Sequence, residues 1–199
     1  MTTAPSTAVA RAKDWRTVDI IVTAVLGVAF GVVFWAWNLF GTVVGPALGF
    51  FAPVAAILNG VFLIPGVAAG LLIRRPGAAI FASTLAATVS LLIGSPYGAI
   101  IILYGAVQGL GAELGFALTG YRRFGLPVAI VAAITAGLST SILDLSIYYS
   151  TWPVLWMLTY AALTVLSSVV LAGIGGWLLV RALGASGALS AFAAGQRRT

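Results

Sequence analysis

Long apolar runs, separated by short polar, glycine-containing or proline-containing segments, dominate the chain from residue 18 to residue 183. Each run is long enough to cross the hydrocarbon core of a bilayer, which takes about 20 residues of α-helix. The predicted transmembrane helices cover residues 19–40, 48–73, 77–94, 98–120, 126–149 and 153–181. This pattern predicts an all-α membrane protein in which six transmembrane helices form one bundle.

The two ends of the chain differ from this central part. Residues 1–17 are polar and lack the apolar run of a cleavable signal peptide. Residues 184–199 are rich in glycine, alanine and serine and contain Arg197 and Arg198. We therefore expect an N-terminal segment at 1–17, a transmembrane substrate-binding domain at 18–183 and a flexible tail at 184–199.

Basic residues predict the orientation of the bundle. In a six-helix arrangement all ten fall on one side: Arg11, Lys13, Arg16, Arg74, Arg75, Arg122, Arg123, Arg181, Arg197 and Arg198. The opposite loops, near residues 41–47, 95–97 and 150–152, contain none. Because cytoplasmic loops are enriched in lysine and arginine, the basic side and both termini are predicted to be cytoplasmic.

Composition agrees with a membrane location and excludes several functions. Of the 199 residues, 61% are hydrophobic and only 7% are charged, against about 25% charged residues in a soluble domain. Histidine and cysteine are absent, and Lys13 is the only lysine. A P-loop for ATP hydrolysis is therefore missing, and neither a metal site nor a cofactor is expected. An intramembrane enzyme is the weakest alternative, since only a carboxylate pair could act.

Glycines recur at four-residue spacing within the predicted helices. The pairs are Gly27/Gly31, Gly66/Gly70, Gly105/Gly109 and Gly111/Gly115. Small residues at this spacing let helices approach closely in lipid. The pairs therefore indicate either packing within the bundle or, for one of them, docking of a different membrane protein.

Polar side chains inside the predicted helices are the candidates for ligand binding. Glu113 and Asp144 are the carboxylates, and Gln108, Asn38 and Asn59 are the amides. Ionisable groups in hydrocarbon normally face a cavity or a partner. Hydrogen bonding between helices is the alternative role for each of them.

Aromatic residues are concentrated in the predicted outer half. They include Trp35, Trp37, Trp152, Trp156, Tyr97, Tyr104, Tyr148 and Tyr149. An interfacial aromatic belt explains part of this excess. A chamber for a flat, cationic, aromatic ligand is the other interpretation, because rings stack on such a ligand and attract its charge.

Two stretches carry a family resemblance. Residues 34–38 read Phe-Trp-Ala-Trp-Asn, and residues 108–113 read Gln-Gly-Leu-Gly-Ala-Glu. In these stretches, and in length and topology, the chain resembles the YkoE-type substrate-binding component (S component) of an energy-coupling factor (ECF) vitamin transporter. The resemblance implies capture of thiamine or its hydroxymethylpyrimidine precursor at the bacterial cell membrane. A membrane T component and cytoplasmic ATPase subunits would then drive uptake.

The resemblance also implies residue roles. Glu113, preceded by Gln108, matches the acid and amide that meet the pyrimidine in thiamine-binding relatives. Gly27 and Gly31 are the nearest match to the small residues through which S components dock the T component.

Taken together, these features place a ligand in the outer half of the bundle. Glu113 and Gln108 are expected to form the floor. Asn38 and Asp144 are expected to hold polar or positively charged groups. The expected aromatic walls are Trp35, Tyr104, Tyr148, Tyr149, Trp152 and Trp156. The alternatives are an S component or secondary porter for another small solute, and a structural or assembly membrane protein in which the acids are interhelical contacts.

Overall fold

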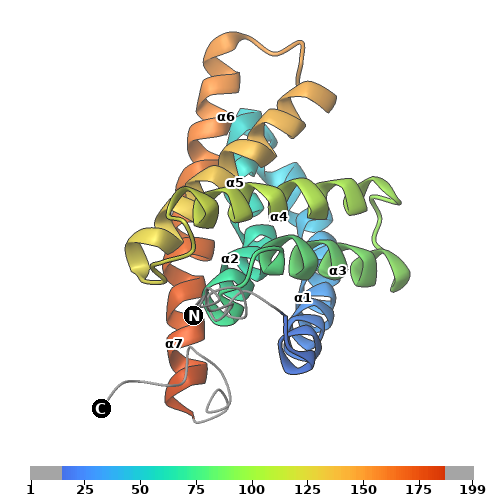
Figure 1. Ribbon diagram of the computed structural model, residues 1–199. Coiled ribbons are helices and arrows are strands. Elements are labelled where there is room, and N and C mark those ends of the chain that lie inside the picture. The colour runs from blue at the N-terminus through green and yellow to red at the C-terminus, as the bar shows by residue number, and fades with distance from the viewer. Residues whose placement is uncertain (1–14, 187–199) are drawn as a thin grey trace, which may run out of the picture.

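The computed structural model describes residues 15–186, so the predicted segments 1–17 and 184–199 lie largely outside the described residues. Within 15–186 every regular element is helical (Figure 1). The elements are α1 (Thr17–Val44), η2 (Gly45–Leu63), α2 (Ile64–Ile73), α3 (Ala78–Leu92), α4 (Ile100–Leu118), α5 (Leu126–Ile147), α6 (Val154–Ser167), η3 (Ser168–Gly175) and α7 (Gly176–Ala185).

Four helical stretches in the described part of the chain are long and apolar enough to cross a membrane. They are Thr17–Ile73, Ile100–Leu118, Leu126–Ile147 and Val154–Ala185. Ala78–Leu92 is a shorter apolar helix, and its 15 residues span only about 22 Å at 1.5 Å per residue. The described residues are therefore those of a multi-pass membrane protein, and their regular elements are all helical.

The predicted loop at residues 41–47 is wrong. Helix α1 continues to Val44, and the 3-10 helix η2 follows it directly. The chain departs from helical geometry later, at Phe51 (φ −148°, ψ 92°), two residues before Pro53. Proline has no N–H to bond the preceding helical turn, and its ring clashes with that turn, so a helix breaks readily just before Pro53.

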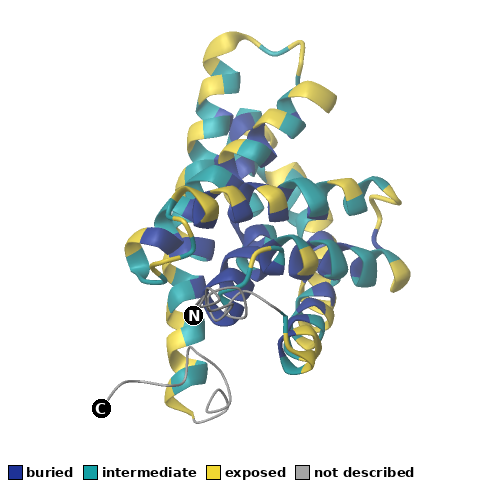
Figure 2. Cartoon of the chain, viewed as in Figure 1, coloured by how far each residue is buried: buried dark blue, intermediate teal, exposed yellow. Residues whose placement is uncertain are grey.

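Glycines on α4 bring three helices together. A Cβ at Gly105 would lie 2.7 Å from the Ser83 carbonyl oxygen of α3, and one at Gly115 would lie 2.3 Å from Cα of Ala132 in α5. Because α4 has glycine on both of these faces, α3 and α5 pack closely on either side of it. In Figure 2 the buried residues concentrate where α2, α3, α4 and α5 cross. These glycines are therefore packing residues within the chain.

Gly27 and Gly31, which were predicted to dock a partner, are packing residues within the described structure. Both are buried on the face of α1 that contacts α3. A Cβ at Gly27 would lie 3.0 Å from Leu85, and one at Gly31 would lie 2.5 Å from Val89. The opposite face of α1 exposes large apolar side chains, among them Val25 and Val32. The glycine pair is thus covered by α3 and does not form an exposed docking surface.

Candidate ligand-binding site

A cavity of about 200 Å³ lies among the helices. Helices α1, α3, α4, α5 and α6, the 3-10 helix η2 and the loops after α3 and α5 all contribute to its wall. The lining residues are Phe34, Asn38, Asn59, Phe62, Ala87, Ser90, Tyr97, Ile100, Ile101, Tyr104, Gln108, Thr140, Asp144, Tyr148, Tyr149 and Tyr160. This wall combines aromatic rings with a few polar groups, as ligand pockets typically do.

Asp144, on α5, is the centre of a hydrogen-bond network in this wall. Its Oδ1 accepts a hydrogen bond from the Tyr104 hydroxyl at 2.7 Å. Its Oδ2 accepts from the Tyr160 hydroxyl at 2.7 Å and from Asn59 Nδ2 at 3.3 Å. An ionised carboxylate can only accept hydrogen bonds, so both tyrosines point their protons at Asp144. The Tyr160 oxygen already accepts a hydrogen bond from Asn59 Nδ2 at 2.9 Å. The lone pairs of the Tyr104 oxygen therefore stay available to a ligand that donates N–H groups.

Asp144 has no cationic partner in the described structure. Lysine and arginine are absent from the cavity wall, and the ion pairs found within residues 15–186 all involve Asp19. The Asp144 side chain is buried, with the residue only 7% exposed. A buried carboxylate without a counter-ion is unfavourable even when hydrogen bonds satisfy it. A positively charged ligand would supply the missing charge.

Two amides provide further polar groups at different places in the wall. Gln108 is buried, and its side chain makes no hydrogen bond within the described residues. Its amide can therefore both donate to and accept from a ligand. Asn38 is already engaged, since its Nδ2 donates to Ser95 Oγ at 3.0 Å and lies 3.4 Å from Ser90 Oγ.

Stacked aromatic rings form one side of the cavity. Tyr104 and Tyr148 stack with centroids 6.4 Å apart. Tyr149 stacks on Trp152 at 4.1 Å, and Trp152 meets Trp156 edge to face at 5.6 Å. The two tryptophans are not lining residues. Trp152 contacts Tyr149 and Tyr160, and Trp156 packs on Trp152.

The structure brings together part of the predicted site. Six predicted residues line the cavity: Asn38, Tyr104, Gln108, Asp144, Tyr148 and Tyr149. Four do not: Trp35, Glu113, Trp152 and Trp156. The sequence did not lead us to predict Tyr160 as a site residue. Asn59 was named only among the polar side chains inside the predicted helices. Tyr160 lies four residues after Trp156 on the same face of α6, which was the available signal.

Glu113 was predicted to form the floor of the site, but it lies outside the cavity wall. Its Oε1 accepts hydrogen bonds from the Gly77 backbone N–H at 2.8 Å and from the Tyr121 hydroxyl, and its Oε2 accepts from the Ala79 N–H at 3.1 Å. Glu113 therefore caps the N-terminus of α3, where a negative charge is favourable. Burial, and then the bond to Glu113, raises the pKa of the Tyr121 hydroxyl, which stays a donor. This carboxylate serves as an interhelical contact instead of the cavity floor.

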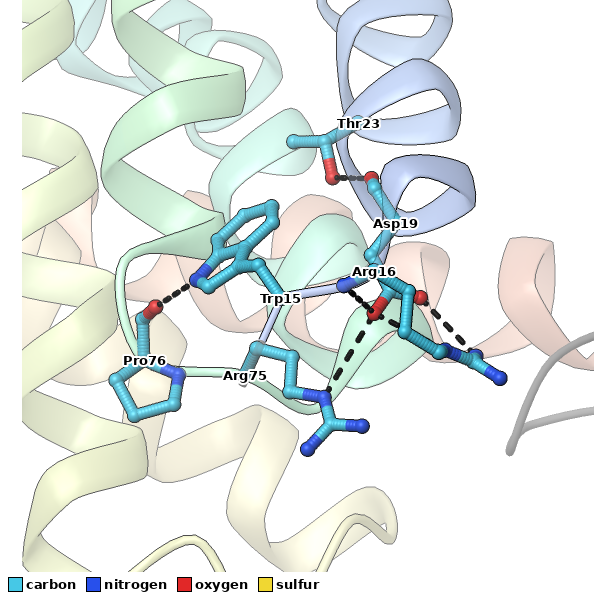
Figure 3. Close-up of polar contacts among 6 residues, drawn as sticks. All are labelled: Trp15, Arg16, Asp19, Thr23, Arg75 and Pro76. Carbon is cyan, nitrogen blue, oxygen red and sulfur yellow. Dashed lines mark hydrogen bonds and ion pairs between the residues drawn. The ribbon is translucent and has the colours of Figure 1, made fainter. Parts of the chain in front are cut away.

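The segment that joins α2 to α3 is also held by the start of α1 (Figure 3). The Trp15 indole donates to the Pro76 carbonyl oxygen at 3.0 Å. Asp19 forms ion pairs with Arg16 at 3.1 Å and with Arg75 at 3.8 Å. Together with Glu113 these contacts tie α1, α3 and α4 at the ends of the helices that lie away from the cavity.

Comparisons with known proteins are consistent with this fold and cavity. Residues 18–139 match the family described as the permease component of an ABC-type cobalt transport system. The chain is 33% identical over 186 residues to a protein of Bacillus subtilis (strain 168) that carries the provisional name HMP/thiamine permease protein YkoE, and the match covers 92% of each chain. A solved structure described as an S-component of an ECF transporter superposes with a TM-score of 0.86 at 32% identity, again over 92% of each chain.

Proposed function

The chain belongs to the YkoE family of S components of ECF transporters, and from this premise we propose that it binds thiamine or its hydroxymethylpyrimidine precursor for uptake. The observation that carries the proposal is the Asp144 carboxylate, buried in a cavity wall of tyrosines without a basic side chain. Thiamine joins an aminopyrimidine to a cationic thiazolium, so it matches both the charge and the aromatic walls of this cavity.

The polar groups of the cavity suit the two halves of thiamine. Asp144 and the faces of the surrounding tyrosine rings attract the positive ring, and the Tyr104 oxygen can accept from an N–H group of the pyrimidine. The Gln108 amide can accept from the exocyclic amino group and donate to a ring nitrogen of the pyrimidine. The stacked pair Tyr104 and Tyr148 offers a ring face to either half. We assign no ligand contact to Glu113.

The proposal extends to membrane topology and partners. We propose six transmembrane passes, with both termini on the cytoplasmic side of the bacterial plasma membrane, because the basic residues then all face the cytoplasm. The sequence has no P-loop. We therefore propose that a T component and ATPase subunits supply the energy for uptake, while this chain supplies the binding site.

Titration of the purified chain tests ligand binding. Thiamine, hydroxymethylpyrimidine and Co²⁺ would be added separately, with heat or intrinsic fluorescence as the signal. We expect saturable binding of the pyrimidine ligands. Asp144→Asn should weaken thiamine binding about ten- to a hundredfold, since it removes a charged hydrogen-bonding partner. It should weaken binding of the uncharged precursor less.

Glu113→Gln is the matched acid-to-amide control, because Glu113 lies outside the cavity wall. It should leave thiamine affinity unchanged. Saturable binding of Co²⁺ without binding of either pyrimidine compound would overturn the proposal. Energy coupling is tested in liposomes, where the chain alone should not accumulate thiamine on an ion gradient.

A further inference from the structure

Four arginines lie at the ends of the helices away from the cavity, and two of them lie over aromatic rings. Arg74 follows α2, Arg122 and Arg123 lie in the loop between α4 and α5, and Arg181 lies on α7. We call these four residues the arginine rim. They come from three separate segments of the chain, so the tertiary structure brings them together.

Aromatic rings hold two of the rim arginines in place. The Arg74 guanidinium lies 5.2 Å from the centroid of the Phe124 ring, and the Arg181 guanidinium lies 5.3 Å from that of Trp177. Phe124 and Trp177 pack against the same buried core cluster. Because both rings are anchored, the two arginines lose less conformational freedom on binding an anion.

The positive charge of the rim is not neutralised within the described structure. Three carboxylates occur in residues 15–186, and each is used elsewhere. Asp19 pairs with Arg16 and Arg75, Glu113 caps α3, and Asp144 lies in the cavity. Within those residues, no ion pair is found for any rim arginine. Arg122, Arg123 and Arg181 are moreover exposed.

The neighbours of Arg181 indicate which kind of anion lies nearby. One and two turns before Arg181, α7 and η3 expose Leu178 (51%) and Ile174 (38%). Exposed apolar side chains of a multi-pass membrane protein face lipid tails. Arg181 and Trp177 thus lie where an apolar surface ends, which is the depth of lipid headgroups and of interfacial tryptophans.

From this placement we propose that the arginine rim binds the phosphate headgroups of anionic phospholipids. The guanidinium groups donate charge-assisted hydrogen bonds to phosphate oxygens, while the acyl chains cover the apolar surface before Arg181. An acidic protein surface would match the charge of the rim, but it would leave the adjoining apolar residues unexplained. This proposal does not depend on the identity of the transported ligand.

The experiment compares the purified chain in vesicles of phosphatidylcholine alone and in vesicles that also contain phosphatidylglycerol. We expect a higher midpoint of thermal unfolding with phosphatidylglycerol, and retention of phosphatidylglycerol by the chain in native mass spectrometry. Each rim arginine replaced by glutamine should reduce the preference for phosphatidylglycerol about fivefold. Raising the salt concentration should reduce it further.

The matched single substitutions are Arg181→Gln and Arg16→Gln. Each removes one positive charge, but Arg16 is paired with Asp19, so only the first should reduce lipid preference. The triple variant Arg122→Lys/Arg123→Lys/Arg181→Lys keeps the charge and should retain most of it. The triple lysine variant still tests the proposal if the triple variant with glutamine at the same three positions fails to fold.

Two results would overturn the proposal. One is equal stability of the wild-type chain in both vesicle types with no retained phosphatidylglycerol. The other is unchanged lipid preference in a folded glutamine variant. A related outcome combines equal stability of the chain in both vesicle types with a glutamine variant that no longer assembles with the T component and ATPases. In that case the rim is a protein contact and the lipid assignment is wrong.

Discussion

The Glu113 carboxylate on α4 accepts a hydrogen bond of 2.8 Å from the backbone N–H of Gly77, the residue that precedes α3. The first N–H groups of a helix have no partner inside the helix. Glu113 satisfies two such groups, those of Gly77 and Ala79, from a neighbouring helix. A buried acid that would otherwise indicate a ligand contact is thus used to fix the position of α3 against α4.

Glu113→Gln should therefore reduce stability without affecting ligand affinity. A glutamine has one acceptor oxygen, and its NH₂ group would face N–H donors. The loss should be about 1–3 kcal/mol, typical of a buried hydrogen-bond partner left unsatisfied. Thermal unfolding in detergent and titration with thiamine check the two halves of this prediction. Gln108→Leu should show the reverse pattern, with weakened binding and little loss of stability.

Removing the tyrosine hydroxyls that bond Asp144 should weaken thiamine binding. Tyr104→Phe and Tyr160→Phe each delete one hydrogen bond of 2.7 Å to the carboxylate. Because hydrogen bonds to charged groups contribute about 1.5–3 kcal/mol, each change should weaken binding tenfold or more. Tyr148→Phe is the control, since Tyr148 lines the same cavity but does not bond Asp144. Equal effects of all three changes would argue against a special role for the Asp144 network.

Glycine-to-alanine substitutions on α1 should distinguish a packing role of Gly31 from a role in docking the T component. A Cβ at Gly31 would lie 2.5 Å from Val89 and 3.0 Å from the Ala86 carbonyl oxygen, whereas one at Gly41 meets nothing within 4 Å. Gly31→Ala should therefore lower the free energy of unfolding by about 1–3 kcal/mol through overpacking. Gly41→Ala should be neutral or slightly stabilising. A stable Gly31→Ala chain that fails to assemble with the T component would restore the docking role.

Accessibility of single cysteines should establish the proposed topology. Thr42, Ala99 and Ser150 are exposed at the ends of helices nearest the cavity, while Pro76 and Arg123 are exposed at the opposite ends. Cysteines at the first three positions should react with an impermeant reagent added to intact cells. Cysteines at Pro76 and Arg123 should react only after permeabilisation. Labelling of Arg123→Cys in intact cells would contradict the predicted orientation.

Bilayer thickness explains why the helical organisation could be predicted from the amino-acid sequence. A predicted helix at 126–149 is observed as Leu126–Ile147, and one at 98–120 as Ile100–Leu118. Apolar runs of this length must be helical in lipid, since their backbone groups can bond only within the segment. The family membership was likewise predicted from two short stretches and is confirmed by the relatives.

The periodicity of an α-helix could also have shown, from the sequence alone, which of these residues share a face. Gln108 and Glu113 are five residues apart, which at about 100° per residue leaves them roughly 140° apart around α4. They therefore cannot share a face, and only Gln108 reaches the cavity. Gly27, Gly31, Phe34 and Asn38 do share a face. Since Phe34 and Asn38 line the cavity, this face points inward.

By itself, the sequence determined the helical class, the approximate helix boundaries and the family, because those follow from local hydrophobicity and short motifs. Only the tertiary structure decided which polar residues meet. The cavity combines Asn59 of η2, Tyr104 of α4, Asp144 of α5 and Tyr160 of α6, which are up to 101 residues apart. Contacts between residues so far apart in the sequence depend on where the helices cross. The close approach of helix backbones at glycines decides those crossings.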